Sequence, residues 1–164
     1  VVDFQEKPDD PPSTLVSIAC YAFPADAVRF REYLDGGNNP DEPGWFIQWL
    51  QDQRDVHAFT FDGAWYDIGT PASYLEAVAW ALNGDTVVSD DATVVDSALG
   101  ENVHVMGDAE VRDSVVDGSL VFPGASIEDC EIVDSIIDEE TRLVNLDLAG
   151  ALIGAHSQIT NGVE

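Results

Sequence analysis

Two short stretches of this sequence carry residues that could act on a phosphate-bearing substrate. The first is Glu6-Lys7-Pro8, an acid and a base beside a proline turn, and its lysine is the only one in the chain. The second, residues 65–71, reads Trp-Tyr-Asp-Ile-Gly-Thr-Pro and puts Asp67 before a glycine turn and a helix start. A carboxylate in such a turn can hold a metal ion or help to line a phosphate site. A lone Asp-x-Gly is more often a solvated loop, so this interpretation of Asp67 depends on the surrounding elements.

The composition predicts a folded, strongly acidic protein. The chain has 164 residues, of which 45% are hydrophobic, enough for one good core or two small ones. Its 32 acids against 6 bases give a net charge of −26, scattered along the sequence. Molar salt screens such self-repulsion, so we expect a salt-rich cytoplasm, as in extreme halophiles. The alternative, a basic protein partner, lacks a localised acidic patch. The charge also argues against nucleic acid and anionic membranes as partners.

The cysteines and the chain ends give the cellular context that we expect. Cys20 and Cys130 match no metal-ligand or redox spacing, which favours a reduced cytoplasmic protein. No apolar run is long enough to cross a bilayer, and the start resembles no signal peptide. The sequence begins at Val1 without an initiator methionine and ends soon after a repeat. We therefore expect a fragment of a longer protein.

Residues 1–84 alternate between strand and helix patterns, which predicts the closing part of an α/β domain. A second helix should be capped by Asp41 and bury Phe46, Ile47 and Leu50. A third should begin after a Thr70 cap and stop at Asn83-Gly84. The predicted strands are 1–6, 15–23, 56–61 and 65–66, with a hairpin turn at Asp62-Gly63, and the predicted helices are 24–34, the one capped by Asp41, and 71–82.

Residues 85–164 contain a repeat of the form small-x-aliphatic-x-Asp-(Ser/Cys)-x-aliphatic. It starts at Ala92, again at Ala109 and again at Ala125, and a shifted copy starts at Cys130. The steps are nearly constant and fall slightly short of three hexapeptides. Short strands at such spacing predict a β-solenoid with three faces, with small residues at the corners and aliphatic residues in a continuous core. An ordinary β-sandwich with accidental similarity is the alternative.

Together these features resemble the sugar-1-phosphate nucleotidylyltransferases. The likeness rests on Glu-Lys-Pro, on Trp-Tyr-Asp-Ile-Gly-Thr-Pro, on the strand that ends near Tyr21, and on the repeat behind them. The family includes glucose-1-phosphate thymidylyl- and uridylyltransferases and mannose-1-phosphate guanylyltransferases. The resemblance implies the C-terminal part of a Rossmann-like nucleotidyltransferase domain at 1–84. It also implies a left-handed parallel β-helix of hexapeptide repeats at 85–164, although strict hexads appear only in scraps such as Ile153-Gly154.

The resemblance also implies roles for individual residues. Lys7 matches the lysine that contacts the sugar-linked phosphate, and Glu6 the glutamate that accepts hydrogen bonds from sugar hydroxyls. Asp67 matches the aspartate that holds Mg²⁺, and Tyr21 matches an aromatic residue near the sugar. The implied substrates are an NTP and a hexose 1-phosphate, joined by positioning and charge neutralisation without a protein nucleophile. The implied assembly is a homo-oligomer held by the β-helix.

One departure from the family limits this interpretation. The glycine-rich loop with Arg and Lys that binds the nucleotide is missing, and so is the second aspartate of the metal site. We therefore expect this chain alone to be inactive. A bifunctional enzyme that also transfers an acyl group through His104, and a non-catalytic regulatory or scaffolding paralogue, stay open as alternatives. Among the bases, the motifs slightly favour thymidylyl over guanylyl or uridylyl transfer.

Overall fold

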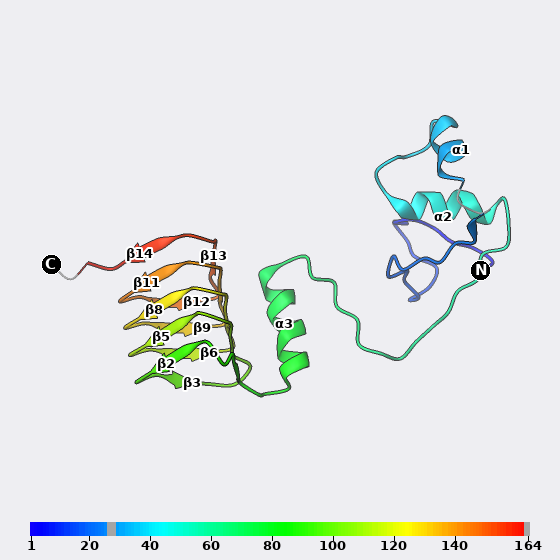
Figure 1. The fold of residues 1–164 in the computed structure, drawn as a ribbon. Coiled ribbons are helices and arrows are strands. Elements are labelled where there is room, and N and C mark those ends of the chain that lie inside the picture. The colour runs from blue at the N-terminus through cyan, green and yellow to red at the C-terminus, as the bar shows by residue number, and fades with distance from the viewer. Residues whose placement is uncertain (26–28, 163–164) are drawn as a thin grey trace. The chain divides into compact units, whose positions relative to one another are not determined.

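The computed structural model describes residues 1–25 and 29–162. By its internal contacts the chain divides into two compact units, Val1–Gly63 and Ala64–Glu164 (Figure 1). The contact-based division follows Gly63 and therefore groups the helix at residues 71–82 with the repeat. The predicted domains, 1–84 and 85–164, follow the start of the repeat in the sequence instead, and they stay a prediction.

The first unit packs around two short helices, α1 (Phe30–Asp35) and α2 (Pro43–Gln51). The predicted stripe of α2 is confirmed, because Phe46, Ile47 and Leu50 are buried together with Tyr33 of α1. The rings of Tyr33 and Phe46 meet edge to face with their centroids 5.4 Å apart, a favoured aromatic geometry. This aromatic cluster is the core of the unit.

The structure corrects several predictions for the first unit. The N-cap of α2 is Glu42, not Asp41. Helix α1 begins at Phe30, so the predicted helix 24–34 is confirmed only in its second half, and residues 26–28 of that prediction lie outside the described residues. The sheet predicted for an α/β domain is not confirmed.

The four strands predicted at 1–6, 15–23, 56–61 and 65–66 are wrong, because these segments form no strand or hairpin. A strand exists through hydrogen bonds to a neighbour. In the described residues none of these segments pairs with another strand. Several of their apolar side chains are consequently exposed, for example Leu15 at 75% and Phe59 at 89%, whereas Phe4, Tyr21, Phe23 and Val56 pack partly buried against the aromatic core.

The second unit opens with helix α3 (Pro71–Leu82), whose predicted ends are confirmed. Thr70 is the N-cap: its hydroxyl accepts a hydrogen bond from Ser73 N at 3.1 Å, and Ser73 Oγ accepts one from Thr70 N at 3.0 Å. This capping box satisfies two backbone donors that the helix cannot satisfy itself. At the other end Asn83 adopts the left-handed conformation, with φ of 52°, which is typical of a helix C-terminus.

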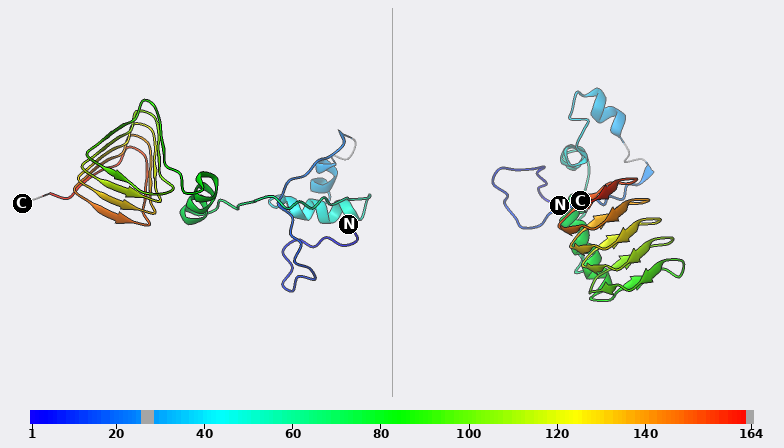
Figure 2. Two further views of the ribbon diagram at one scale, coloured as in Figure 1. Left: turned by 90° about the horizontal axis from the view of Figure 1, so that it is seen from below. Right: turned by 90° about the vertical axis from the view of Figure 1, so that its left-hand side faces the viewer.

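After α3 the chain winds into a parallel β-solenoid of three sheets (Figure 2). Sheet A has the order β1-β4-β7-β10-β13, sheet B the order β14-β11-β8-β5-β2, and sheet C the order β12-β9-β6-β3. The three-faced solenoid predicted from the repeat is thereby confirmed. The strands are β1 (Val87–Val88), β2 (Thr93–Val95), β3 (Ala98–Leu99), β4 (His104–Val105), β5 (Glu110–Arg112), β6 (Val115–Asp117), β7 (Leu120–Val121), β8 (Ser126–Glu128), β9 (Glu131–Val133), β10 (Ile136–Ile137), β11 (Arg142–Val144), β12 (Asp147–Ala149), β13 (Leu152–Ile153) and β14 (Gln158–Thr160).

The solenoid core consists of aliphatic side chains stacked in register on successive coils. In sheet B, Val111 pairs with Ile127 and Ile127 with Leu143, and all three are fully buried. Sheets A and C supply equivalent stacks. Burying one such side chain contributes about 1.5–3 kcal/mol. Stacking is therefore what stabilises the coils, since no single coil can cover its own apolar residues.

Residues in the left-handed conformation turn the chain at the corners. At the corner between sheets B and C these are aspartates and an asparagine, which tolerate positive φ better than most residues: Asp96, Asp113, Asp129 and Asn145, with φ between 48° and 57°. The prediction of small residues at the corners is confirmed only in part, at the left-handed Gly118, Gly124 and Gly150. The buried alanines, such as Ala109 and Ala125, lie one position past the corner and point into the core. The repeated Asp of the sequence is therefore a corner residue.

The coils are shorter than the predicted three hexapeptides. Register partners on successive coils, such as Val111 and Ile127, keep the spacing of the sequence repeat. The corner residues show where the length is lost. The side from Gly118 to Gly124 is a full hexapeptide step, whereas the side from Asp113 to Gly118 is one residue shorter. The side that follows Gly124 is shortened in the same way, so this coil keeps a single hexapeptide step, whereas the coil that starts at Asp96 keeps two, from Asp96 to Asn102 and from Asn102 to Asp108.

At several corners a serine follows the corner aspartate and links neighbouring coils. Ser114 Oγ donates to Arg112 O at 2.6 Å and accepts from Cys130 N of the next coil at 3.0 Å. Ser135 makes the equivalent bonds at another corner, to Val133 O at 2.7 Å and from Ala151 N at 3.0 Å. Each hydroxyl thus satisfies a backbone donor inside the wall of the solenoid.

Helix α3 lies beside sheet A (Figures 1 and 2). Its residues Pro71, Leu75 and Ala79 line one groove together with the corner that leads into this sheet. The outward side chains of sheet A, which alternate with its core residues, show what the helix covers. In the middle coils Leu120 and Ile136 are only 1% and 5% exposed, whereas Leu152 in the last coil is 57% exposed.

Candidate functional site

Helix α2 holds the Glu-Lys stretch through two glutamine side chains. Gln51 Nε2 donates to Phe4 O at 2.9 Å, and Gln48 Oε1 accepts from Glu6 N at 2.8 Å. Gln48 and Gln51 are three residues apart and therefore lie on the same side of the helix. The extended segment from Phe4 to Glu6 thus runs along α2 although it pairs with no strand.

Gly44 lets the carboxylate of Glu6 approach the first turn of α2. A Cβ atom at this position would lie 1.6 Å from Glu6 Oε2, far inside any allowed contact. Gly44 is buried in the described structure. The first turn of a helix is also where the helix dipole favours a negative charge. A glycine at the second position of this helix is therefore explained by its contact with Glu6.

Lys7 is held by Glu42, the N-cap residue of the same helix. The ammonium group of Lys7 forms an ion pair with Glu42 Oε1. The carboxylate of Glu42 also accepts hydrogen bonds from Trp45 Nε1 at 2.9 Å and from Asn39 Nδ2 at 3.4 Å. Lys7 itself has a positive φ of 47°, a conformation of a non-glycine residue that often marks a functional position.

The ion pair shifts the protonation of both partners in the expected directions. Hydrogen bonding to Glu42 and the negative charge of that carboxylate raise the pKa of Lys7, and the charge of Glu6 adds to this. The hydrogen bonds from Lys7 and Trp45 lower the pKa of Glu42. Lys7 is thus kept cationic next to Glu6, as a phosphate ligand should be.

Tyr21 is an aromatic residue at the edge of the first unit's core. Its ring centroid lies 6.0 Å from that of Phe23, and its hydroxyl shares a hydrogen bond of 2.9 Å with Ser17 Oγ. Tyr21 is partly buried against the cluster that contains Phe46. Its predicted position near a sugar stays a prediction.

Asp67 lies in the second unit, exposed in the loop that precedes α3. In the described parts of the chain no three His, Cys, Asp or Glu residues lie close enough together to hold a metal ion. Mg²⁺ commonly uses only one or two protein carboxylates and takes its other ligands from water and substrate phosphates. The role of Asp67 as one ligand of such a Mg²⁺ ion, and its joint action with Lys7, stay predictions.

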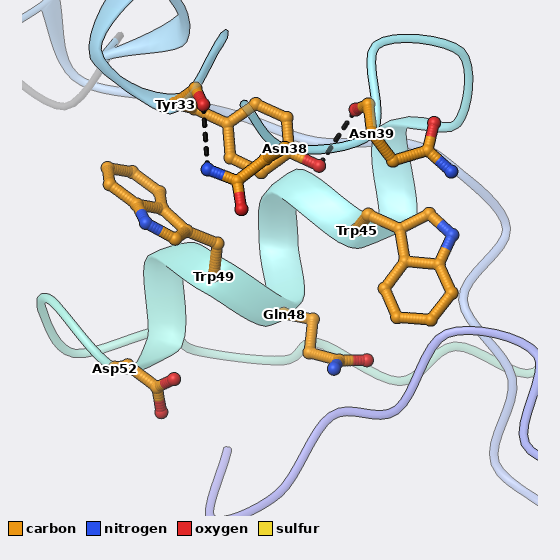
Figure 3. A pocket seen from close by; sticks show the side chains of 7 residues that line it. All are labelled: Tyr33, Asn38, Asn39, Trp45, Gln48, Trp49 and Asp52. Atoms are coloured by element: carbon orange, nitrogen blue, oxygen red, sulfur yellow. Dashed lines mark hydrogen bonds between the residues drawn. The ribbon is translucent and has the colours of Figure 1, made fainter. Parts of the chain in front are cut away.

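A hollow of about 240 Å³ lies on the first unit between α2 and the loop after α1 (Figure 3). The loop is tied to α1, because Tyr33 Oη donates to Asn39 O at 2.8 Å and Asn38 Nδ2 donates to Tyr33 O at 2.7 Å. The ring of Trp49 stacks on that of Phe46 with the ring centroids 5.8 Å apart, and the guanidinium carbon of Arg29 lies 5.7 Å from the Trp49 ring centroid. The Trp49 side of the hollow is therefore already engaged in packing contacts within the unit.

The three histidines of the sequence lie in separate parts of the structure. His104 lies in β4 on the outward side of sheet A and is partly buried. His57 is exposed, and His156 Nδ1 lies 3.1 Å from Glu140 Oε2 at a corner of the solenoid. No observation here favours an acyl-transfer role for His104.

Sequence reasoning missed the residues that hold Glu6 and Lys7 in place. The sequence patterns gave no site role to Glu42, Gly44 or Gln48. One signal was available in the sequence. Helix propensity disfavours a glycine directly after Glu-Pro at a helix start, so its presence indicates another role. Its partner could not have been identified, because Glu6 lies in a distant part of the sequence, before the whole of α1.

Comparison with known proteins places the chain in a family. The family model described as "Nucleotidyl transferase" matches residues 1–84, half of the chain. The chain belongs to the nucleotidyl transferase family. It is 28% identical over 188 residues to a glucose-1-phosphate adenylyltransferase of Desulfitobacterium hafniense (strain Y51), covering 97% of this chain and 46% of that protein. It is 26% identical over 191 residues to the enzyme of the same name from Bacillus mycoides (strain KBAB4), covering 99% and 48%. The chain spans about half the length of the curated relatives it matches.

No helix in the described parts of the chain has the length and apolar character needed to cross a bilayer.

Proposed function

We propose that the protein containing this chain transfers a nucleotidyl group from an NTP to a hexose 1-phosphate and releases pyrophosphate. The observation that carries the proposal is that helix α2 and its cap residue hold the neighbouring residues Glu6 and Lys7 in place, in a chain of the nucleotidyl transferase family. The curated relatives, named for transfer to glucose 1-phosphate, support a hexose phosphate as the acceptor.

In the proposed reaction an oxygen of the sugar phosphate attacks the α-phosphorus of the NTP. The bond from the α-phosphorus to the bridging oxygen breaks, and pyrophosphate leaves with the electron pair. Lys7 neutralises and orients the attacking phosphate, and Glu6 accepts hydrogen bonds from the sugar hydroxyls near Tyr21. Asp67 would hold Mg²⁺, which when bound offsets the charge of the nucleotide phosphates. The rate gain then comes from positioning and electrostatics.

The nucleotide and the sugar are finer parts of the proposal. The relatives are named as adenylyltransferases of glucose 1-phosphate, which supports ATP and glucose 1-phosphate. The sequence motifs slightly favoured dTTP instead. Since the two predictions differ only in the nucleotide, one substrate panel decides between them.

The test uses the full-length protein that contains this chain, in molar KCl. Pyrophosphate release is followed with glucose 1-phosphate and ATP, dTTP, UTP or GTP, with Mg²⁺ and after its removal by EDTA. We expect release with one of these nucleotides and its loss with EDTA. No release with any of the four nucleotides would refute the proposed activity.

Two substitutions test the roles assigned to single residues. Lys7→Ala and Asp67→Ala should each lower kcat/KM by about 100-fold or more, since Lys7 is assigned to the sugar phosphate and Asp67 to the Mg²⁺ that would offset the charge of the nucleotide phosphates. Asp62→Ala is the matched control, because it removes a nearby exposed loop aspartate with no assigned role. Full activity in Lys7→Ala or Asp67→Ala would contradict the assignment for that residue. Far-UV circular dichroism should show the same fold in all three variants.

We also propose that the solenoid mediates homo-oligomer formation. What supports this proposal is the regular surface of a parallel β-solenoid. Its strands pair with one another and its aliphatic residues pack inside, so the outward side chains of its sheets are available for contacts with another copy. This part of the proposal concerns assembly and can be tested without the catalytic reaction.

A further inference from the structure

We propose that the outward surface of sheet B is the face through which two copies of this chain associate. We call this surface face B. The inference rests on the proposed role of the solenoid in assembly and adds which surface and which residues make the contact. Its partner is a second copy of the same chain, related by a two-fold axis.

The distribution of basic side chains distinguishes face B from the other faces of the solenoid. From Ala64 onward the sequence holds 20 acidic residues and only two bases, Arg112 and Arg142. Both arginines lie on strands of sheet B, β5 and β11. Arg112 Nε lies 3.3 Å from Glu110 Oε2, and Arg142 Nη2 lies 3.2 Å from Glu128 Oε2. The formal charges of these four residues cancel in an otherwise strongly acidic unit.

The other two faces are poor candidates for self-association. The outward side of sheet C carries Asp117, Glu131 and Asp147, all exposed, and its strands contain no cation. Two such surfaces would repel each other. Sheet A has α3 beside it, and its outward residues in the middle coils are already buried. Within the second unit, face B is thus the one side of the solenoid that is both open and electrically balanced.

A two-fold axis makes face B complementary to itself. If the axis runs parallel to the solenoid axis between two such faces, the strands of the two copies point in opposite directions. With the axis passing over position 111, position 110 of one copy lies opposite position 112 of the other, on the same coil. Glu110 of each copy therefore meets Arg112 of its neighbour, and the pair occurs twice because the contact is isologous.

The remaining residues of face B fit such a contact. Val95 is 38% exposed and Val144 is partly buried, so each provides apolar surface beside the charged pairs. Exposed ion pairs contribute little affinity, typically below about 1 kcal/mol each. Charge complementarity mainly excludes wrong arrangements. We therefore infer that the charged pairs fix the alignment of the two copies, and that the valines provide the apolar contact that holds the copies together.

The experiment measures self-association of the full chain by sedimentation velocity over a range of protein concentrations. KCl is kept at the lowest concentration at which the wild-type chain stays folded, so that charges are screened as little as possible. Arg112→Glu and Glu110→Arg each place like charges opposite one another. Either one should raise the dissociation constant of the dimer by about 10- to 100-fold. The double variant Glu110→Arg/Arg112→Glu restores opposite charges and should restore association.

Glu131→Arg is the matched control, because it makes the same charge change as Glu110→Arg on the outward side of sheet C. It should leave the dimer intact. A monomeric wild-type chain at every concentration would overturn the proposal, and so would association that is insensitive to the single reversals. Rescue by Glu110→Arg/Arg142→Glu instead of the first double variant would overturn the pairing of Glu110 with Arg112.

Folding and catalysis are kept separate from this result. If Arg112→Glu lowers the melting temperature of the chain, Arg112→Gln replaces it, and association equal to wild type in that variant would count against the proposal. The readout is association alone. A failure here therefore leaves nucleotidyl transfer untouched, and a failure of the activity assay leaves face B untouched.

Discussion

The serine ladder at the solenoid corners gives a stability prediction that can be worked from single atoms. Ser114 is only 3% exposed, and its hydroxyl accepts the N–H of Cys130 at 3.0 Å and donates to the carbonyl of Arg112 at 2.6 Å. In Ser114→Ala the carbonyl of Arg112 keeps a second donor, the N–H of Asp129 at 3.1 Å. The N–H of Cys130 loses the acceptor that Ser114 provides.

One buried donor without a partner costs about 1–3 kcal/mol. For a unit of about 100 residues this should lower the melting temperature by roughly 5–15 °C. The assay is thermal unfolding of the full chain, followed by circular dichroism in the β region. We expect Ser114→Cys to lose less than half as much, because Cys130 occupies the same place one coil later and contacts Glu128 O at 3.1 Å.

The matched control is Ser89→Ala, which deletes a hydroxyl of a partly exposed serine in the first coil that makes no side-chain hydrogen bond among those described. Its free energy of unfolding should change by less than about 0.5 kcal/mol. A loss in Ser114→Ala no larger than that of Ser89→Ala would refute the reasoning. An equal loss in Ser114→Cys and Ser114→Ala would show that the bridging contact is not the cause.

Two further predictions concern charge. Lys7 has a raised pKa and Glu42 a lowered one, so their pair should stabilise the first unit in the range between the ordinary values of 4.5 and 10.5. This contribution should be lost as the pH falls through the pKa of Glu42 in the folded chain, or rises through that of Lys7. An NMR titration of Lys7, the only lysine, checks this, and an unchanged lysine pKa in Glu42→Gln would contradict the pairing. The net charge of −26 predicts that dilution from about 2 M to 0.1 M KCl, where the Debye length grows from under 3 Å to about 10 Å, lowers the melting temperature. A melting temperature independent of salt would remove the argument for a salt-rich environment.

Local sequence signals predicted helix α3, the buried stripe of α2 and the solenoid. The Thr70 cap and the Asn83 terminus of α3 are confirmed, because capping depends on residues within one turn of the helix end. The repeat predicted three faces and the aliphatic core, since residues such as Val111 and Ile127 must meet when identical coils stack. The same pattern did not reveal that the repeated Asp turns the corner. Composition and spacing leave the backbone conformation of that residue open.

The candidate site was predictable only in part. The motifs indicated Glu6, Lys7, Tyr21 and Asp67, but Glu42 and Gly44 were found only in the structure. The predicted strands in the first unit failed for a related reason. Alternation of apolar residues indicates that a segment can form a strand, whereas the strand itself requires a partner to bond with.

The sequence by itself determined the interactions that act over a few residues or repeat at a constant interval. These are the caps of α3, the buried stripe of α2, the three-faced solenoid and the family motifs. Only the tertiary structure decided the contacts between distant residues, such as Lys7 with Glu42 and Glu6 with Gly44. It also placed both arginines of the second unit on one face. The physical reason is that short-range and periodic interactions are written into neighbouring residues, while a contact between distant parts of the chain depends on how the intervening residues pack.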